Sequence, residues 1–169
     1  MHWADYTAQR LMERGGEQVS ASGITPSGEF HIGHLREILS AEMIHRACLD
    51  AGMSSKYIFI VDSMDPLRRV YDFLSPEYEE FIGCPLAYIP APDDDGSPGD
   101  GSVTYADHFL SPFLDSLEQI GVRPEVVMNH ETYEKGLFAE YIDSAITNRE
   151  EIRRIIQQIS GRELPSDWF

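Results

Sequence analysis

The sequence has 169 residues, of which 42% are hydrophobic and 25% charged, and its 29 acidic against 13 basic residues give a net charge of -16. These are ordinary values for a soluble globular chain that is long enough to bury one core. They exclude a membrane-spanning segment, since no run is long and apolar enough, and they argue against a chain that holds an RNA backbone unaided.

The acidic surplus has two readings. RNA phosphates are bound mainly by Lys and Arg, so we expect weak RNA binding, while adaptation to high salt or solubility explains the same charge. Residues 1–5 lack the basic start and apolar stretch of a secretory signal, and we expect a cytoplasmic protein. Cys48 and Cys84 lie far apart in the sequence, which favours buried or partly buried thiols over a disulfide or a catalytic pair.

Hydrophobic spacing predicts alternating strands and helices. A strand over 18–22 precedes a helix over 32–50, and a strand over 56–62 follows. After an irregular insertion, a helix over 105–120 and a strand over 125–128 are expected. This alternation is typical of a doubly wound α/β fold.

Two further segments have local signals. The acidic Pro/Gly loop over 91–102 contains three consecutive Asp residues, but it lacks the alternating ligand spacing of an EF-hand, which favours a flexible loop over a calcium site. Over about 137–160, apolar residues recur at three- and four-residue steps, which predicts a single core-facing helix that Gly161 ends.

The most informative segment is residues 23–34, Gly-Ile-Thr-Pro-Ser-Gly-Glu-Phe-His-Ile-Gly-His. Its turn joins the first strand to the long helix and places His31 and His34 at the helix N-terminus. Backbone N–H groups and the helix dipole favour a polyphosphate there, and Gly33 allows a nucleotide to approach closely. Pre-placed donors suit attack on the α-phosphate of ATP, so we predict an ATP site in which both histidines act as electrostatic clamps.

Two other interpretations of the histidines were weighed. An isolated pair three residues apart on a helix more often fills a polar surface, but the preceding turn favours the phosphate site. A zinc site is disfavoured, because a helical metalloprotease pair has four-residue spacing with an adjacent Glu, and no Cys pair supplies further ligands. We therefore predict no protein-held metal.

The sequence resembles the class I lysyl-tRNA synthetases. The likeness rests on Gly-Ile-Thr-Pro-Ser-Gly at 23–28, on His-Ile-Gly-His-Leu-Arg-Glu at 31–37, and on Asp-Ser-Met-Asp-Pro-Leu-Arg-Arg-Val at 62–70. Residues 2–5, 76–83, 105–109 and 164–168 also match in order and spacing, so nearly the whole chain is covered. The resemblance implies a Rossmann-like (HUP-type) nucleotide-binding fold with a parallel sheet and an inserted, mostly helical segment at about 64–124.

The resemblance also implies functional roles. His31 and His34 match catalytic positions and, with Gly23 and Thr25, belong to a site for lysine and for ATP with Mg²⁺. The matching lysine-binding positions are Gly23, Thr25, Asp62 and Asp65. The matching ATP-binding positions are Thr25, Pro26, Ser27, Gly28, His31, Gly33 and His34.

The two aspartates have a structural interpretation as well. Asp62 and Asp65 follow a strand at the edge where doubly wound sheets bind ligands, and their carboxylates suit a lysine side chain or magnesium. Equally, Asp62 is expected to cap a following helix, and Asp65 to pair with Arg68 or Arg69. The residues leave both readings open.

Departures from the family are informative. His34 stands where this family usually has Asn, Ser63 stands where a second acidic residue is usual, and the acidic stretch over 93–102 replaces a region with a Cys-His-Glu-Ser sequence. The family is much longer, with a second catalytic half that carries a mobile Lys-Met-Ser-Lys-Ser loop and an anticodon-binding region. The Met-Ser-Ser-Lys run at 53–56 imitates that loop but is predicted to be the turn after the first long helix.

We therefore interpret residues 1–169 as the amino-terminal half of a class I lysine–tRNA ligase catalytic domain, truncated before the carboxy-terminal half. Such an enzyme activates lysine to lysyl-adenylate and transfers it to tRNA(Lys), which this acidic part is expected to bind weakly or not at all. One alternative is a stand-alone small-molecule adenylyltransferase, whose Gly-x-Phe-Asp-Pro turn is absent here. The other is a non-catalytic nucleotide-binding module completed by a partner chain.

Overall fold

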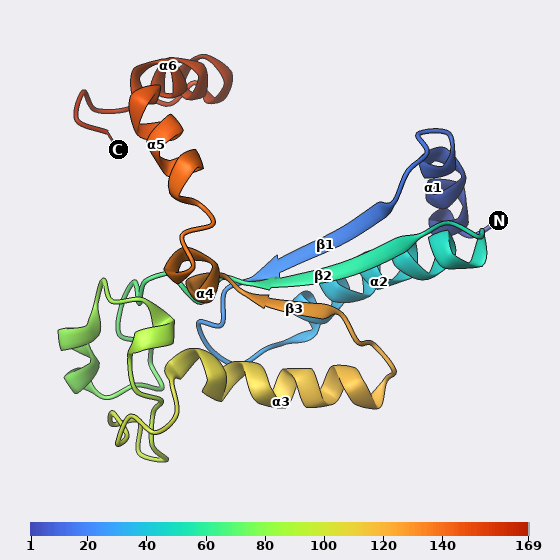
Figure 1. The fold of residues 1–169 in the computed structure, drawn as a ribbon. Coiled ribbons are helices and arrows are strands. Elements are labelled where there is room, and N and C mark those ends of the chain that lie inside the picture. Colours follow the sequence, from blue (N-terminus) through green and yellow to red (C-terminus); the bar gives the residue numbers. More distant parts are fainter. Residues whose placement is uncertain (169) are drawn as a thin grey trace. The chain divides into compact units, whose positions relative to one another are not determined.

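A computed structural model of the chain describes residues 1–168. It divides into two compact units, Met1–His130 and a second that begins at Glu131. The first unit contains a sheet of three parallel strands in the order β1-β2-β3 (Figure 1). These strands are β1 (Gln18–Ile24), β2 (Ser55–Val61) and β3 (Glu125–Met128). All three predicted strands are present, although β1 runs two residues further than expected and β2 is shifted by one.

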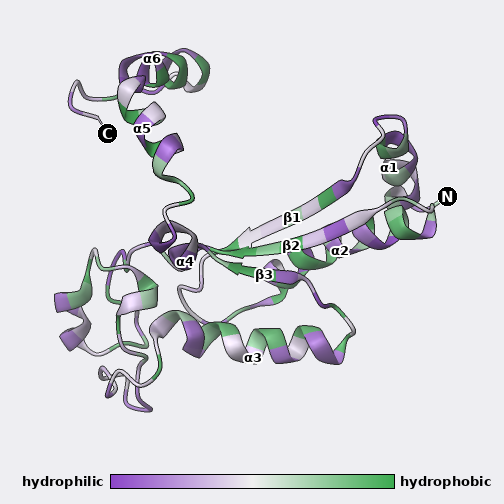
Figure 2. Cartoon of the chain, in the orientation of Figure 1, coloured by the Kyte–Doolittle hydropathy of each residue, from purple (hydrophilic) through white to green (hydrophobic). Residues whose placement is uncertain are grey.

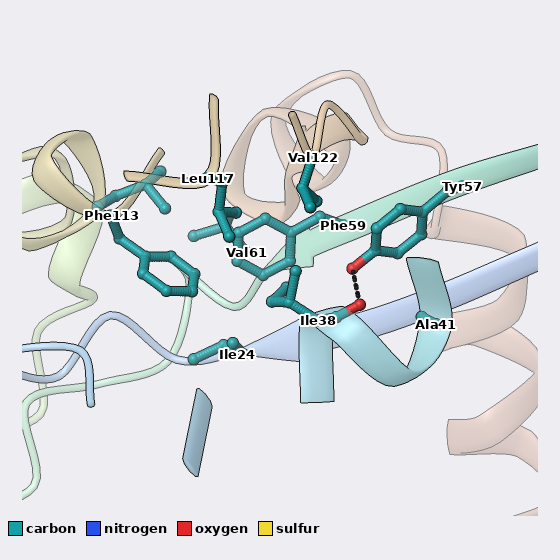
Figure 3. Close-up of a cluster of buried hydrophobic side chains, with 10 residues drawn as sticks. Ile24, Ile38, Ala41, Tyr57, Phe59, Val61, Phe113, Leu117 and Val122 are labelled. Atoms are coloured by element: carbon teal, nitrogen blue, oxygen red, sulfur yellow. Dashed lines mark hydrogen bonds between the residues drawn. The ribbon is translucent and has the colours of Figure 1, made fainter. Parts of the chain in front are cut away.

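The main core lies on one face of this sheet. Helices α2 (Ile32–Asp50) and α3 (Tyr105–Gln119) both pack there (Figure 1), because each presents an apolar stripe to alternate residues of β2. Figure 3 shows Tyr57, Phe59 and Val61 of β2 among the side chains of these helices. The Tyr57 hydroxyl donates a 3.2 Å hydrogen bond to the carbonyl of Ile38, which ties the strand to α2.

The predicted helix bounds agree closely with α2 and α3. Phe109, Phe113 and Leu117 face the core as expected, whereas Ile120 lies just beyond α3 and is 53% exposed. The turn expected after the first long helix is also present, since Gly52 has a φ of +80° before β2 begins at Ser55.

The first helix of the chain was not predicted by sequence analysis. Helix α1 (Trp3–Met12) packs on α2 through buried Ala4 and Ala8, against Ala47 and Cys48. The two residues that α1 buries are alanines, which do not stand out as core residues in the sequence. Cys48 is buried, as predicted, and Cys84 is partly buried; both are free thiols.

The segment between β2 and α3 forms a second core beside the sheet. It contains two 3-10 helices, η1 (Pro76–Phe81) and η2 (Leu86–Tyr88), and the acidic loop that precedes α3. Tyr78 and Tyr105 are fully buried at its centre, with ring centroids 6.1 Å apart. This packing anchors the N-terminus of α3 and, through it, the turn that follows β1.

The second unit differs from the prediction. The single helix expected over 137–160 is two helices, α5 (Ala139–Thr147) and α6 (Arg149–Ser160), and neither has a buried residue. The core-facing prediction is therefore wrong for the unit as described, and Ile146 and Ile159 are 51% and 81% exposed. Figure 2 shows apolar and polar residues alternating along both helices. Gly161 does end α6, with a φ of +69°.

A short helix joins the strand region to this unit. Helix α4 (Asn129–Glu134) starts directly after β3, so its first residue lies at the carboxyl end of the sheet. Across residues 1–168, none of the helices has both the length and the apolar character needed to cross a membrane. The parallel sheet with its crossover helices confirms the predicted α/β Rossmann-like fold.

Candidate active site

The carboxyl end of β1 leads into a turn that is fixed from two sides. Within the turn, the Ser27 N–H donates to the Thr25 carbonyl at 2.9 Å, and Pro26 is fully buried beneath it. The Tyr105 hydroxyl of α3 donates a 2.9 Å hydrogen bond to the Ser27 carbonyl. Gly28 lies against the ring of Phe73, and an added Cβ would be 3.5 Å from it. The turn therefore has one defined course into α2.

His31 and His34 cap the N-terminus of α2 reciprocally. Nδ1 of His31 accepts the Gly33 N–H at 3.0 Å, and Nδ1 of His34 accepts the His31 N–H at 3.0 Å. Their rings stack with centroids 3.9 Å apart. This is a capping box in which imidazoles replace the usual Ser and Glu. The predicted position of both histidines at the helix N-terminus is confirmed.

The capping bonds define the tautomer of both rings. A backbone N–H is always a donor, so each Nδ1 must be an unprotonated acceptor, and each neutral ring carries its proton on Nε2. Burial lowers the pKa of His34 from its ordinary value, the charge of His31 lowers it further, and Glu37 opposes the shift. His34 is therefore held as a neutral Nε2–H donor.

Gly33 is required by this arrangement. A Cβ at Gly33 would lie 2.8 Å from Cε1 and 2.9 Å from Nδ1 of His31, closer than real Cβ contacts. Any side chain there would displace the His31 ring from its cap. The glycine was predicted for close nucleotide approach, and the structure adds a second reason for it.

A pocket of about 350 Å³ opens beside this turn. It lies between the end of β1, the first turns of α2 and the loop that follows β2. Its polar lining comes from the backbone of the turn and from charged side chains of α2 and that loop. The lining residues are Gly23, Ile24, Thr25, Ser27, His34, Glu37, Pro66, Arg68 and Tyr71.

Three carboxylates surround the end of β1 at this pocket. Glu37 of α2 accepts the Gly23 N–H at 3.0 Å, and Asp65 accepts the Thr25 hydroxyl at 2.7 Å. A Cβ built on Gly23 would lie 3.7 Å from Oδ2 of Asp62. Burial raises the pKa of Asp62 above its usual value, and the charges of Asp65 and Glu37 raise it further. This concentration of negative charge suits a cationic ligand group.

The structure separates the two readings of the aspartates. Asp65 pairs with Arg68 at 3.3 Å, as the structural reading expected, while it also bonds Thr25. The next helix after Asp62 is η1, which begins only at Pro76, so the predicted role of Asp62 as a helix cap is wrong. Its Oδ1 instead accepts the Asn129 side-chain N–H at 3.2 Å.

Most predicted site residues come together here. Gly23, Thr25, Ser27 and His34 line the one pocket, and Asp65 bonds a lining residue. Pro26, Gly28, His31 and Gly33 shape the turn and the helix cap behind it. Sequence analysis missed Glu37 and Arg68 as lining residues, although both lie within motifs that it quoted. It also missed Tyr105 and Asn129, which reach the site from distant parts of the chain.

The fit of a protein-held metal was also tested. Within residues 1–168, no group of three or more His, Cys, Asp or Glu side chains has the geometry to hold a metal ion. The three carboxylates near Gly23 bond backbone and side-chain donors instead of converging on one point.

Comparison with known proteins agrees with this geometry. A family model described as tRNA synthetases class I (K) matches residues 1–169. Lysine–tRNA ligase of Archaeoglobus fulgidus is 44% identical over 169 residues, which is 100% of this chain and 33% of the relative. Lysine–tRNA ligase 1 of Methanosarcina acetivorans is 42% identical over 99% of this chain and 30% of its own. Lysine–tRNA ligase of Methanocaldococcus jannaschii is 42% identical over 100% of this chain and 31% of the relative.

The chain thus spans about a third of the length of the curated relatives that it matches. The match confirms the resemblance seen in the motifs, and it does not favour an adenylyltransferase. The chain belongs to the class I tRNA synthetase family denoted K.

Proposed function

We propose that this chain forms the part of a lysine–tRNA ligase that binds ATP and lysine. The observation that carries the proposal is the strand-turn-helix of residues 23–34, whose turn, helix N-terminus and neutral His34 donor meet at one pocket. A pocket that brings the turn and the His34 imidazole together with Glu37 suits a nucleotide and an amino acid together. The family match supports the same assignment.

The nucleotide phosphates would bind at the N-terminus of α2. The helix dipole and the Nε2–H donors of His31 and His34 would stabilise negative charge there. In the free chain, the His31 ring accepts the Gly33 N–H, so a phosphate oxygen would compete with that ring for this donor. The ATP-contacting set that we propose is the one predicted from the sequence, Thr25, Pro26, Ser27, Gly28, His31, Gly33 and His34.

Lysine would bind at the carboxylate end of the pocket. Gly23, Thr25, Asp62 and Asp65 are the proposed contacts, and Glu37 adds a third negative charge beside them. In the complete protein, the lysine carboxylate would attack the α-phosphate of ATP and release pyrophosphate. The ribose hydroxyl at the 3′ end of tRNA would then attack the lysyl carbonyl of the adenylate, forming the ester and releasing AMP. Positioning and electrostatics supply the acceleration, so no nucleophilic side chain is needed.

The charge of the chain and of ATP indicates how Mg²⁺ and tRNA would bind. Mg²⁺ prefers phosphate oxygens and retains water, so it would arrive on ATP rather than in a protein cage. With a net charge of -16, this chain would contribute little to tRNA affinity, and other sequence would hold tRNA(Lys). We also propose that the protein is cytoplasmic. Residues 1–169 would form the amino-terminal half of the catalytic domain, and further sequence would supply the other half.

Equilibrium titration tests the proposal on the chain itself. We expect ATP to bind the parent chain, and His31→Ala and His34→Ala to weaken ATP binding while the far-UV circular dichroism is unchanged. Lysine binding should be weakened less than ATP binding in both variants, since neither histidine is among the proposed lysine contacts. Loss of helical signal in both variants would instead assign the histidines a purely structural role.

A further inference from the structure

A second polar cluster lies at the carboxyl ends of β2 and β3, where it joins the motif at 62–70 to Asn129 and His130, which no quoted motif contains. Val61 and Met128 are paired in the sheet, so the residues that follow these strands are neighbours. Asp62 and Ser63 come from one strand end, and Asn129 from the other. The cluster has no unsatisfied buried side-chain atom among the described residues.

The hydrogen bonds of Asn129 define how its amide is oriented. Its Oδ1 accepts the Met64 N–H at 2.8 Å and the Ser63 hydroxyl at 3.3 Å. Because a backbone N–H can only donate, the amide oxygen must face Met64, and the amide nitrogen must face the other way. That nitrogen donates to Oδ1 of Asp62 at 3.2 Å. The amide therefore presents a donor to the carboxylate and cannot flip without losing two bonds.

Ser63 and His130 hold this arrangement in place. The Ser63 side chain is fully buried, its hydroxyl oxygen lies 2.7 Å from Nδ1 of His130, and it accepts the His130 N–H at 3.3 Å. The ring of Tyr88 packs edge-on against His130, with centroids 5.9 Å apart. A fully buried hydroxyl is inaccessible to a substrate, so this Ser-His pair fastens the two strand ends and does not act as a nucleophile.

The two oxygens of Asp62 have different surroundings. Oδ1 is held by Asn129, whereas Oδ2 is directed toward Gly23 at the end of β1, beside the pocket. A cationic residue in place of Asn129 would neutralise the carboxylate. A neutral amide orients it and leaves its charge for a ligand.

We propose that Asn129 is a positioning residue for the amino-acid substrate: it turns Oδ2 of Asp62 toward a ligand ammonium group and leaves the carboxylate charge uncompensated. This inference rests on the proposed lysine site. It explains why the lysine contact at the end of β2 depends on a residue 67 positions away in the sequence.

The charges that face Asp62 come from two other elements. Glu37 lies on α2, and Asp65 lies in the loop after β2, where it is paired with Arg68. His34 lines the pocket from α2 and is held neutral. Both carboxylates oppose ionisation of Asp62, whereas the Asn129 N–H favours it, so removing that N–H should raise the Asp62 pKa.

The first test compares Asn129→Ala with Asn148→Ala in the full chain. Asn148 is a matched control, because its amide donates a 2.8 Å bond to the Ser144 carbonyl within the second unit. Asn129→Ala should raise the Asp62 pKa, which ¹³C NMR of the Asp62 carboxyl carbon measures. It should also weaken lysine binding about tenfold, which is the effect expected for the loss of one hydrogen bond to a charged group. The pH dependence of lysine binding should move with that pKa. Asn148→Ala should change none of these.

A second pair of variants guards against misfolding. Asn129→Asp keeps an acceptor for the Met64 N–H but sets a carboxylate against Asp62, so it should also raise the Asp62 pKa and weaken lysine binding. In the double variant Asn129→Asp, Asp62→Asn, the amide at position 62 can donate to the carboxylate at position 129. The hydrogen bond is restored, but the negative charge lies at position 129 instead of position 62. We expect the double variant to recover the unfolding midpoint without recovering lysine affinity.

The outcomes distinguish this inference from the proposed function. If Asn129→Ala and Asn129→Asp leave the Asp62 pKa and lysine affinity unchanged, Asn129 does not position the carboxylate. Recovery of lysine binding in the double variant would assign Asn129 a structural role only, which also overturns the inference. If the parent chain binds no lysine while the Asp62 pKa still rises in Asn129→Ala, the positioning stands and the proposed lysine site fails.

Discussion

The main-chain N–H of His31 donates a 3.0 Å hydrogen bond to Nδ1 of His34, and the two rings stack 3.9 Å apart. The same pair therefore serves two purposes. It caps α2, which stabilises the helix, and it directs two Nε2–H donors away from the helix, where a phosphate can accept them. Protonation of either Nδ1 would break a capping bond, so the cap depends on neutral imidazoles.

The first prediction concerns the pKa of His34. The His34 pKa should lie below the ordinary histidine value of about 6.5, and His31→Ala should raise it, because that change increases the exposure of His34 and removes the electrostatic effect of His31 that lowers its pKa. Two-dimensional NMR of the ring protons across pH 4 to 8 measures both values. An unchanged His34 pKa in His31→Ala would contradict the proposed coupling.

The sign of the resulting pH dependence can be stated. A histidine whose pKa is lower in the folded than in the unfolded chain binds protons first in the unfolded chain. The contribution of neutral His34 to the free energy of unfolding is therefore complete above the ordinary histidine pKa. It is lost as the pH falls from there through the lowered pKa of the folded chain. We expect His34→Gln, which cannot titrate, to reduce the slope of unfolding free energy against pH in that interval.

The second prediction is that Gly33→Ala will impair the site more than the fold. Loss of the His31 cap costs about 1 kcal/mol, and the higher helix propensity of alanine offsets about the same amount. We expect a small change in the urea midpoint and a clear loss of ATP affinity, compared by denaturation and calorimetry. Ser40→Ala, in the same helix but away from the cap, is the control. Unaltered ATP binding in Gly33→Ala would show that the cap geometry is irrelevant to the nucleotide.

The third prediction uses two matched tyrosines. Tyr105 and Tyr78 are both fully buried, and each donates a 2.9 Å hydrogen bond to a carbonyl, of Ser27 and of Pro90 respectively. Replacing either by Phe should cost about 1 to 2 kcal/mol of unfolding free energy, since a partly buried carbonyl loses its donor. Only Tyr105→Phe should also weaken ATP binding, because only Tyr105 holds the turn. Equal effects of both variants on ATP would mean that the turn needs no such support.

The fourth prediction is that salt stabilises the chain. With a net charge of -16, repulsion between carboxylates opposes folding, and the screening length falls from about 10 Å at 0.1 M to about 3 Å at 1 M. The thermal midpoint should therefore rise with KCl over this range. Glu80→Lys, at an exposed position, should raise the midpoint at low salt and flatten the salt response. A midpoint that is flat or falls with KCl would exclude self-repulsion as an important term.

Local patterns predicted the first unit well. The bounds of α2 and β3 follow from periodicity and turn residues. The His-x-Gly-His motif lies at the helix N-terminus as predicted, and its capping role is seen only in the structure. Helix α1 was not predicted; its packing depends on Ala4 and Ala8, whose small side chains do not mark a core position in the sequence. The second unit was misread because its apolar spacing continues through Asn148, while the backbone there departs from helix at φ -101° and ψ 16°.

The site was predicted only where its residues are close in sequence. The turn and the helix cap are local, so one motif sufficed for them. Tyr105 and Asn129 reach the site from 78 and 67 positions away from their partners, and only the tertiary structure brings them there. Glu37 was visible within a quoted motif, but nothing in the sequence indicated that its carboxylate would bond the Gly23 N–H.

The central claim, that residues 23–34 and the pocket beside them activate lysine, is tested most directly by ATP-pyrophosphate exchange. The chain should be assayed with each amino acid, alone and together with the part of the Archaeoglobus fulgidus relative that it does not match, with that part alone as a control. We predict exchange that requires both polypeptides and lysine and that His34→Ala abolishes. Exchange that another amino acid supports equally, or none from the folded pair with lysine, would contradict the account.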